Sequence, residues 1–82
     1  MIPFSLAWEP PAEDELAEIW LQSPDRWAVT RAQAKIDQLL KADPIANGAH
    51  LSEGLYTIHV PPLRCNYTID VANRHVEVTW VR

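Results

Sequence analysis

The sequence predicts an α+β fold, in which a helical hairpin packs on one face of a mostly antiparallel sheet. Two observations carry this prediction. In the last third of the chain, residues 55–60, 63–71 and 75–82 alternate apolar and polar side chains, which is the period of a strand with one buried face. Before them, two stretches repeat apolar residues at the spacing of an amphipathic helix. The expected order is strand, helix, helix, strand, strand, strand, within a single domain over residues 1–82.

The N-terminal segment is expected to form a strand followed directly by a helix. Residues 2–8 alternate weakly, and Pro3 favours an edge strand because proline has no N–H to donate to a ladder. Pro11 suits the first turn of a helix, and the acidic residues after it complement the positive end of the helix dipole. This helix is expected to end near Gln22, and its apolar stripe consists of Ala12, Leu16, Ile19 and Trp20.

A second helix is expected from about Asp25 to Ala42. Ser23-Pro24-Asp25 breaks the first helix and can cap the second, and Asp43-Pro44 ends it. Asn47-Gly48 then predicts a turn into a polar loop. Both helices must bury their apolar stripes, and the apolar face of the sheet is the large surface available to them. The stripe of the second helix contains Ala28, Val29, Ala32, Ile36, Leu39 and Leu40.

The three C-terminal strands have a predicted register. Pro61-Pro62 and Ala72-Asn73 are treated as two-residue connections, which places every apolar residue of the three strands on one face. A slip of one residue would destroy that agreement. The expected pairs are Val60 with Leu63, Ile58 with Cys65, Tyr56 with Tyr67, Ile69 with Val76, Tyr67 with Val78, and Cys65 with Trp80.

The other face of the sheet is expected to stay partly open, and a functional site would have to lie there. Its residues are all polar or charged. They are Thr57, His59, Arg64, Asn66, Thr68, Asp70, Glu77 and Thr79.

Composition narrows the class of protein. The net charge is -4, whereas a protein whose affinity comes from phosphate contacts is usually basic. The charge therefore argues against a nucleic-acid-binding enzyme. No basic region followed by an apolar run opens the chain, so neither a signal peptide nor a membrane span is expected. The single Cys65 is interpreted as a buried thiol of a cytoplasmic protein in a reducing compartment. The tryptophans are interpreted mostly as core, and Trp27 is the one expected to be partly exposed.

Taken together, five segments resemble the RelE/ParE superfamily of type II toxin–antitoxin toxins. The most specific is the strand 63–70, which is similar to the Tyr-Arg-x-x-Tyr-x-Ile/Val strand of that superfamily. The order and spacing of the segments match over nearly the whole chain. The five segments are 15–20, 37–44, 54–56, 63–70 and 76–81.

The resemblance implies an antitoxin partner and one of two activities. RelE-like members are ribosome-dependent endoribonucleases that cleave mRNA, and ParE-like members poison DNA gyrase. The resemblance carries Arg64 over as the arginine of the Arg-x-x-Tyr motif, and it places Arg82 where the superfamily often has a basic residue after the last strand. The chain departs from RelE-like members in two places, because the loop before Gly54 has no basic cluster and no His-Arg or terminal Tyr segment follows Arg82.

The candidate catalytic residues are Arg64, His59 and Arg82. Metal-independent RNA cleavage needs a base for the 2′-hydroxyl, a cation for the developing phosphate charge and an acid for the leaving group. His59 and Arg64, expected as cross-strand neighbours, supply the first two, and Arg82 or His75 is the nearest further group. The simpler interpretation is two solvated polar side chains beside a turn. An ion pair of Arg64 with an acidic residue of its own fold or of an antitoxin is an equal alternative.

No cofactor and no metal are expected. The two glycines form no phosphate loop, and the histidines and Cys65 lack the spacing of metal ligands. Three functions therefore stay open. The first is a toxin-like protein that an antitoxin neutralises and that acts on ribosome-bound mRNA or on gyrase. The second is an inactive binding protein of the same fold, and the third is a ribonuclease that works without the ribosome.

Overall fold

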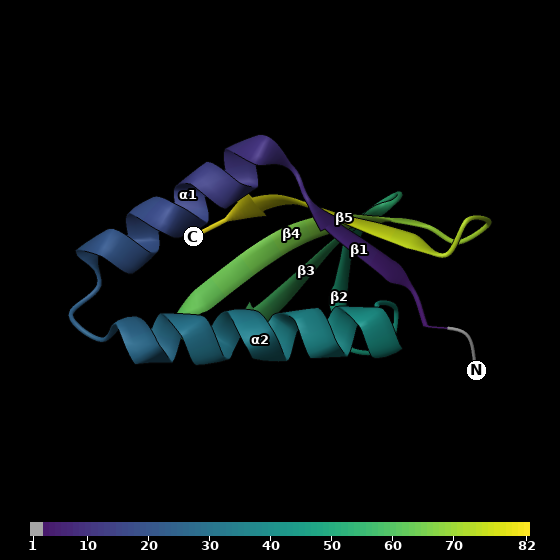
Figure 1. The fold of residues 1–82 in the computed structure, drawn as a ribbon. Helices are drawn as coiled ribbons and strands as arrows, with labels where there is room; N and C mark the ends of the chain where they lie inside the picture. The colour runs from purple at the N-terminus through teal and green to yellow at the C-terminus, as the bar shows by residue number, and fades with distance from the viewer. Residues whose placement is uncertain (1–2) are drawn as a thin grey trace.

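A five-stranded sheet with two helices forms the molecule (Figure 1). The computed structural model describes residues 3–82. The strands lie in the order β1-β5-β4-β3-β2, and all neighbours are antiparallel except β1 and β5. The α+β class and the mostly antiparallel sheet are thus confirmed. The elements are β1 (Ser5–Trp8), α1 (Pro10–Gln22), α2 (Arg26–Ala42), β2 (Ala49–Ser52), β3 (Leu55–Val60), β4 (Leu63–Asp70) and β5 (His75–Val81).

Helix α2 supplies most of the helical side of the core. The Asp25 carboxylate caps it by accepting a hydrogen bond from the Ala28 N–H at 3.0 Å. Its end is closed by the Asp43 N–H, which donates to the Leu39 carbonyl at 3.0 Å. The helix lies across one face of the sheet (Figure 1). Its fully buried side chains are Val29, Ala32, Ile36 and Leu40, four of the six that the sequence predicts for its stripe.

Helix α1 packs less deeply than its apolar stripe predicts. It runs beside the C-terminal part of β5 and splays away from α2 (Figure 1). Ala12 is the one residue of α1 that is fully buried, while Leu16 and Ile19 are half-buried against the core. Trp20 stays 39% exposed, so its assignment to the buried stripe was wrong. The reason is geometric, because a helix at the edge of a sheet covers less apolar surface than one lying across it.

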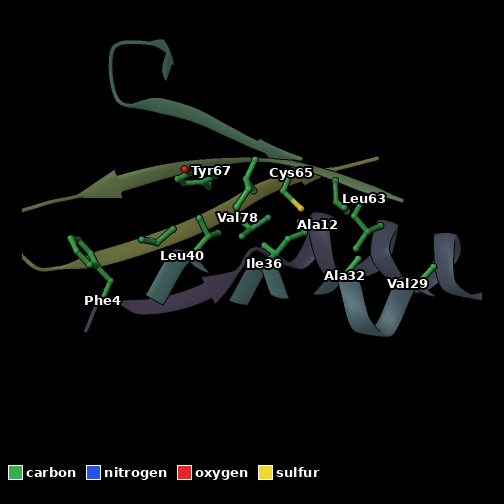
Figure 2. Close-up of a cluster of buried hydrophobic side chains, with 13 residues drawn as sticks. Phe4, Ala12, Val29, Ala32, Ile36, Leu40, Leu63, Cys65, Tyr67 and Val78 are labelled. Carbon is green, nitrogen blue, oxygen red and sulfur yellow. The ribbon is translucent and has the colours of Figure 1, made fainter. Parts of the chain in front are cut away.

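The core joins α2 to the middle strands of the sheet. Figure 2 shows Tyr67, Cys65 and Val78 pointing from β4 and β5 toward Ile36 and Leu40 of α2. Cys65 is fully buried, as predicted. The phenol of Tyr67 donates a 2.6 Å hydrogen bond to the Pro44 carbonyl, which ties the end of α2 to β4.

The first hairpin, β3–β4, has the predicted register. Pro61-Pro62 forms the two-residue connection, through a cis peptide bond, and Val60 lies opposite Leu63. The pairs of Ile58 with Cys65 and of Tyr56 with Tyr67 are confirmed as well.

The second hairpin, β4–β5, departs from the predicted register near its end. Ile69 pairs with Val76 and Tyr67 with Val78, but Cys65 pairs with Val81 instead of Trp80. A bulge at Thr79 causes the shift, because one extra residue of β5 lies between the pairs of Tyr67 and Asn66. Val81 is fully buried and Trp80 is not, so the bulge exchanges a bulky indole for a smaller side chain in the core. The regular register would have put Arg82 opposite Leu63 on the core side.

Strand β2 was not predicted; a polar loop was expected there. Residues 49–52 pair with β3 across an irregular register, and all four are exposed. A strand this short, with no buried face, gives no periodic signal. Gly54 completes the β2–β3 turn with φ of 75°, a left-handed conformation that glycine adopts without strain.

The exposure of the tryptophans and the start of the N-terminal strand also differ from the prediction. Trp27 is 73% exposed, as expected, whereas Trp8 and Trp80 are half-buried and therefore less buried than predicted. The N-terminal strand begins at Ser5 rather than at residue 2, and residue 2 of the predicted strand lies outside the described part of the chain. Among residues 3–82, neither helix is long and apolar enough to cross a membrane.

Candidate functional site

His59, Arg64 and Arg82 lie in one row across three strands. His59 of β3 is the register partner of Arg64 of β4. On the other side, Arg64 and Arg82 exchange both backbone hydrogen bonds, each at 2.8 Å. Their chain neighbours Ile58, Cys65 and Val81 are buried against the helices, so by alternation the three side chains belong to the open face. We call these three residues the basic row.

The bulge at Thr79 is what brings Arg82 into the basic row. It shifts the end of β5 by one residue, so that Arg82 rather than Val81 lies opposite Arg64. Sequence reasoning named Arg82 from the resemblance, but the alternation it relied on would have turned that residue inward.

The side chains of His59 and Arg64 face solvent, and their polar groups have no partner within residues 3–82. Neither side chain makes a hydrogen bond or an ion pair with another residue of the described range 3–82, and both residues are exposed. Strand β2 covers β3 only as far as Thr57, so the end of β3 lies at the rim of the sheet. A hollow of about 490 Å³ follows this rim, and His59 and Arg64 are part of its lining together with Asn47 and Gly48. Small anionic groups can therefore reach both side chains.

Arg82 is tied to helix α1. Its Nη1 donates to Glu15 Oε1 at 2.6 Å, and its guanidinium lies 5.2 Å from the centre of the Trp80 ring. Glu15 therefore offsets the charge of Arg82, while no carboxylate of residues 3–82 forms an ion pair with Arg64. Neither Glu15 nor Trp80 was a candidate from the sequence, because only the packing of α1 beside β5 reveals the contact.

His75 does not belong to the basic row. It pairs with Asp70 at the opposite end of β4, and its Nδ1 lies 2.8 Å from the Ser5 hydroxyl. Its Nε2 is 3.6 Å from the Glu77 carboxylate. The expectation that His75 could complete the site was wrong, because the antiparallel register puts it at the far end of the strand from Arg82.

The far end of the open face is acidic. The pKa of Glu9 is raised, first by a hydrogen bond with Glu77, then by partial burial and by the Glu77 charge. The pKa of Asp70 is lowered, mainly by hydrogen bonds from Asn73. The Glu9 and Glu77 carboxyl groups would repel a phosphate, whereas the basic row offers it positive charge.

The basic row has groups that can bind a phosphodiester and supply part of the chemistry of its cleavage. Arg64 offers a planar guanidinium for two phosphate oxygens, and the His59 imidazole can accept or donate a proton. The row contains no carboxylic acid and no second imidazole for the leaving group. Within residues 3–82, no three His, Cys, Asp or Glu side chains are grouped so that they could hold a metal ion.

Cys65 takes no part in this chemistry. Burial, with a smaller contribution from the Asp37 charge, raises the pKa of its thiol to about 12. It lies on the core face, opposite to His59. A thiol with this pKa stays protonated and is a poor nucleophile or metal ligand.

Comparisons with known proteins agree with the fold. No family model and no curated protein matches the sequence. Among solved structures, a chain of the toxin–antitoxin complex RelBE2 from Mycobacterium tuberculosis superimposes with a TM-score of 0.74 at 20% sequence identity. The match covers 100% of this chain and 92% of that one. At this identity the likeness shows the fold, and the RelE/ParE-like fold that the sequence predicts is confirmed.

Proposed function

We propose that the chain is the toxin-like component of a type II toxin–antitoxin module, bound and neutralised by an antitoxin in the cytoplasm. The observation that carries the proposal is the full-length fold match to a chain of a toxin–antitoxin complex. The basic row adds chemistry to that match, since it gathers an imidazole and two guanidinium groups on an uncovered sheet face.

In the first form of the proposal, the target is mRNA. His59 takes the proton of a 2′-hydroxyl, and Arg64 stabilises the negative charge that develops on the phosphate. Arg82, held by Glu15, orients a neighbouring phosphate group. The leaving 5′-oxygen takes its proton from a group of the ribosome, because the row has no acid of its own. Dependence on the ribosome follows from this division of roles.

Growth after induced expression tests this form. We expect the wild-type chain to arrest a bacterial host and Arg64→Ala to relieve the arrest, at equal levels of folded protein. Arg31→Ala is the matched control, because Arg31 is an exposed arginine on α2, outside the basic row. Arrest by the wild type and by Arg64→Ala alike would contradict a role for Arg64. No arrest by the wild type would contradict toxicity in that host.

A second candidate, binding without cleavage, is favoured by the charges of the open face. Arg82 is offset by Glu15, and the Glu9–Glu77 end repels phosphate. Such a protein would bind its antitoxin, or a protein target such as DNA gyrase, through other surfaces. Inhibition of gyrase supercoiling that is insensitive to Arg64→Ala would support the gyrase form. An absence of inhibition, together with an absence of growth arrest, would leave an inactive binding protein.

A further inference from the structure

The outer side of the helical hairpin carries an apolar groove that the fold itself does not need. Helices α1 and α2 splay apart, and two adjoining hollows of about 540 and about 370 Å³ lie between and beside them. Trp20 and Thr30 line both hollows. We call this surface the hairpin groove, and its main residues are Leu16, Trp20, Leu21, Trp27, Val29 and Thr30.

Large apolar side chains stand exposed along the hairpin groove. Trp27 is 73%, Leu21 56% and Trp20 39% exposed. Clustered exposed apolar residues mark interaction sites, and tryptophan and arginine dominate the energetic centres of protein interfaces. Trp20 is also held in place, because its indole N–H donates to the Thr30 hydroxyl at 3.3 Å and the Arg26 guanidinium lies 4.6 Å from its ring centre. A ring that is already fixed loses little entropy on binding.

The two helices of the hairpin carry opposite charges, and Glu13 of α1 and Arg26 of α2 line the hairpin groove itself. The exposed charged residues of α1 are all acidic, and the exposed charged residues of α2 are all basic. The one acidic residue of α2, Asp37, is half-buried and accepts a hydrogen bond from the Trp8 indole at 3.0 Å. The exposed charges are Glu13, Asp14 and Glu18 on α1, and Arg26, Arg31, Lys35 and Lys41 on α2.

This arrangement is complementary to itself. A two-fold axis parallel to the helices places α1 of one copy on α2 of the other, so that acidic meets basic on both sides. A two-fold axis across the helices would place α1 on α1 and α2 on α2, where like charges repel. The parallel axis also keeps both hairpin turns at the same end. Trp20, at the end of α1, would then face Trp27, at the start of α2, of the other copy.

We infer that the hairpin groove is the interface of a homodimer, in which two helical hairpins pack as a four-helix bundle with α1 on α2. By alternation with buried neighbours, the basic row lies on the face of the sheet opposite to α2, so this dimer leaves the proposed site open. The inference stands apart from the proposed function, since it concerns a different surface and the purified chain alone.

Sedimentation of the purified chain over a range of concentrations tests the dimer. We expect the wild type to pass reversibly from monomer to dimer, and Trp27→Ser or Leu21→Ser to weaken the dimer at least about tenfold. Val71→Ser is the matched control, because Val71 is 58% exposed but lies in the β4–β5 turn. Circular dichroism checks that each variant is folded, and the two groove variants serve as independent tests.

The salt dependence of dimerisation distinguishes this charge-paired arrangement of helices from a nonspecific apolar contact. Raising the ionic strength from about 0.1 M to about 1 M shortens the screening length from roughly 10 Å to roughly 3 Å, so the predicted dimer weakens. A dimer that holds or strengthens in high salt contradicts the charge pairing. A wild type that stays monomeric at every concentration overturns the inference, as does an equal loss of dimer in Val71→Ser. Burial of Trp27 only when another protein is added also overturns it, because the occupant is then a different chain.

Discussion

Gly48 and Tyr67 determine how the chain after α2 meets the sheet. A Cβ atom on residue 48 would collide with the Tyr67 hydroxyl and lie 2.9 Å from the Thr57 carbonyl oxygen. We expect Gly48→Ala to destabilise the fold by about 1–3 kcal/mol, because Tyr67 can yield only by giving up its hydrogen bond to Pro44. Urea unfolding measures this loss.

The same contact provides the control for that measurement. Tyr67→Phe removes the hydroxyl, so Gly48→Ala should cost less in the Tyr67→Phe background than in the wild type. Equal costs in the two backgrounds would show that the collision with Tyr67 is not the cause.

Two buried groups make stability sensitive to alkaline pH. Burial raises the pKa of the Cys65 thiol from 9.0 to about 12 and that of the Tyr67 phenol from 10.0 to about 12. Both pKa values are raised in the folded state, so their contribution is complete below about pH 9 and is lost as pH rises toward about 12. We expect the free energy of unfolding to fall over this window, and to fall less steeply in Tyr67→Phe. Identical slopes in wild type and variant would contradict the assignment to Tyr67.

At the scale of elements, the contact between α1 and β5 controls the charge of the basic row. Glu15→Gln should change stability by less than about 1 kcal/mol, because the Glu15–Arg82 pair is largely exposed to solvent. It should also raise the affinity for inorganic phosphate, since Arg82 is no longer offset. Phosphate titration followed by NMR measures that change.

Glu18→Gln is the matched control, with the same loss of charge on the same helix but at a residue that makes no ion pair with Arg82. Glu18 accepts a hydrogen bond from Gln22 instead. Equal gains in phosphate affinity for the two variants would point to net charge alone. No gain in either would contradict the role given to Glu15.

The elements also show what the sequence can predict and where it stops. The helix limits follow from proline, the Asp25 cap and the period of apolar residues, and the first hairpin follows from alternation. Alternation alone could not reveal the bulge, since Thr79-Trp80-Val81 fits either register until Val81 is seen to be buried. The exposure of Trp20 and the Glu15–Arg82 contact depend on where α1 lies relative to the sheet. No local pattern in the sequence encodes that position.

At the scale of the whole molecule, the open sheet face has two electrostatic ends. His59 and Arg64 occupy one end, and Glu9, Glu77 and Asp70 the other. This separation explains how a chain with a net charge of -4 can still offer a local anion site. The candidate residues His59, Arg64 and Arg82 could be named from the sequence. Their alignment in one row required the register of three strands and the bulge.

The assignment of the basic row to RNA is tested most directly by mRNA cleavage in a bacterial translation extract. Cleavage is read out as new 5′ ends on a translated message. We expect cleavage by the wild type and by Arg31→Ala, and its loss in Arg64→Ala. Cleavage should also be absent when the same mRNA is not being translated, because the basic row lacks an acid for the leaving group. Cleavage by Arg64→Ala at the wild-type rate, or none by the wild type, would contradict the assignment of the basic row to RNA.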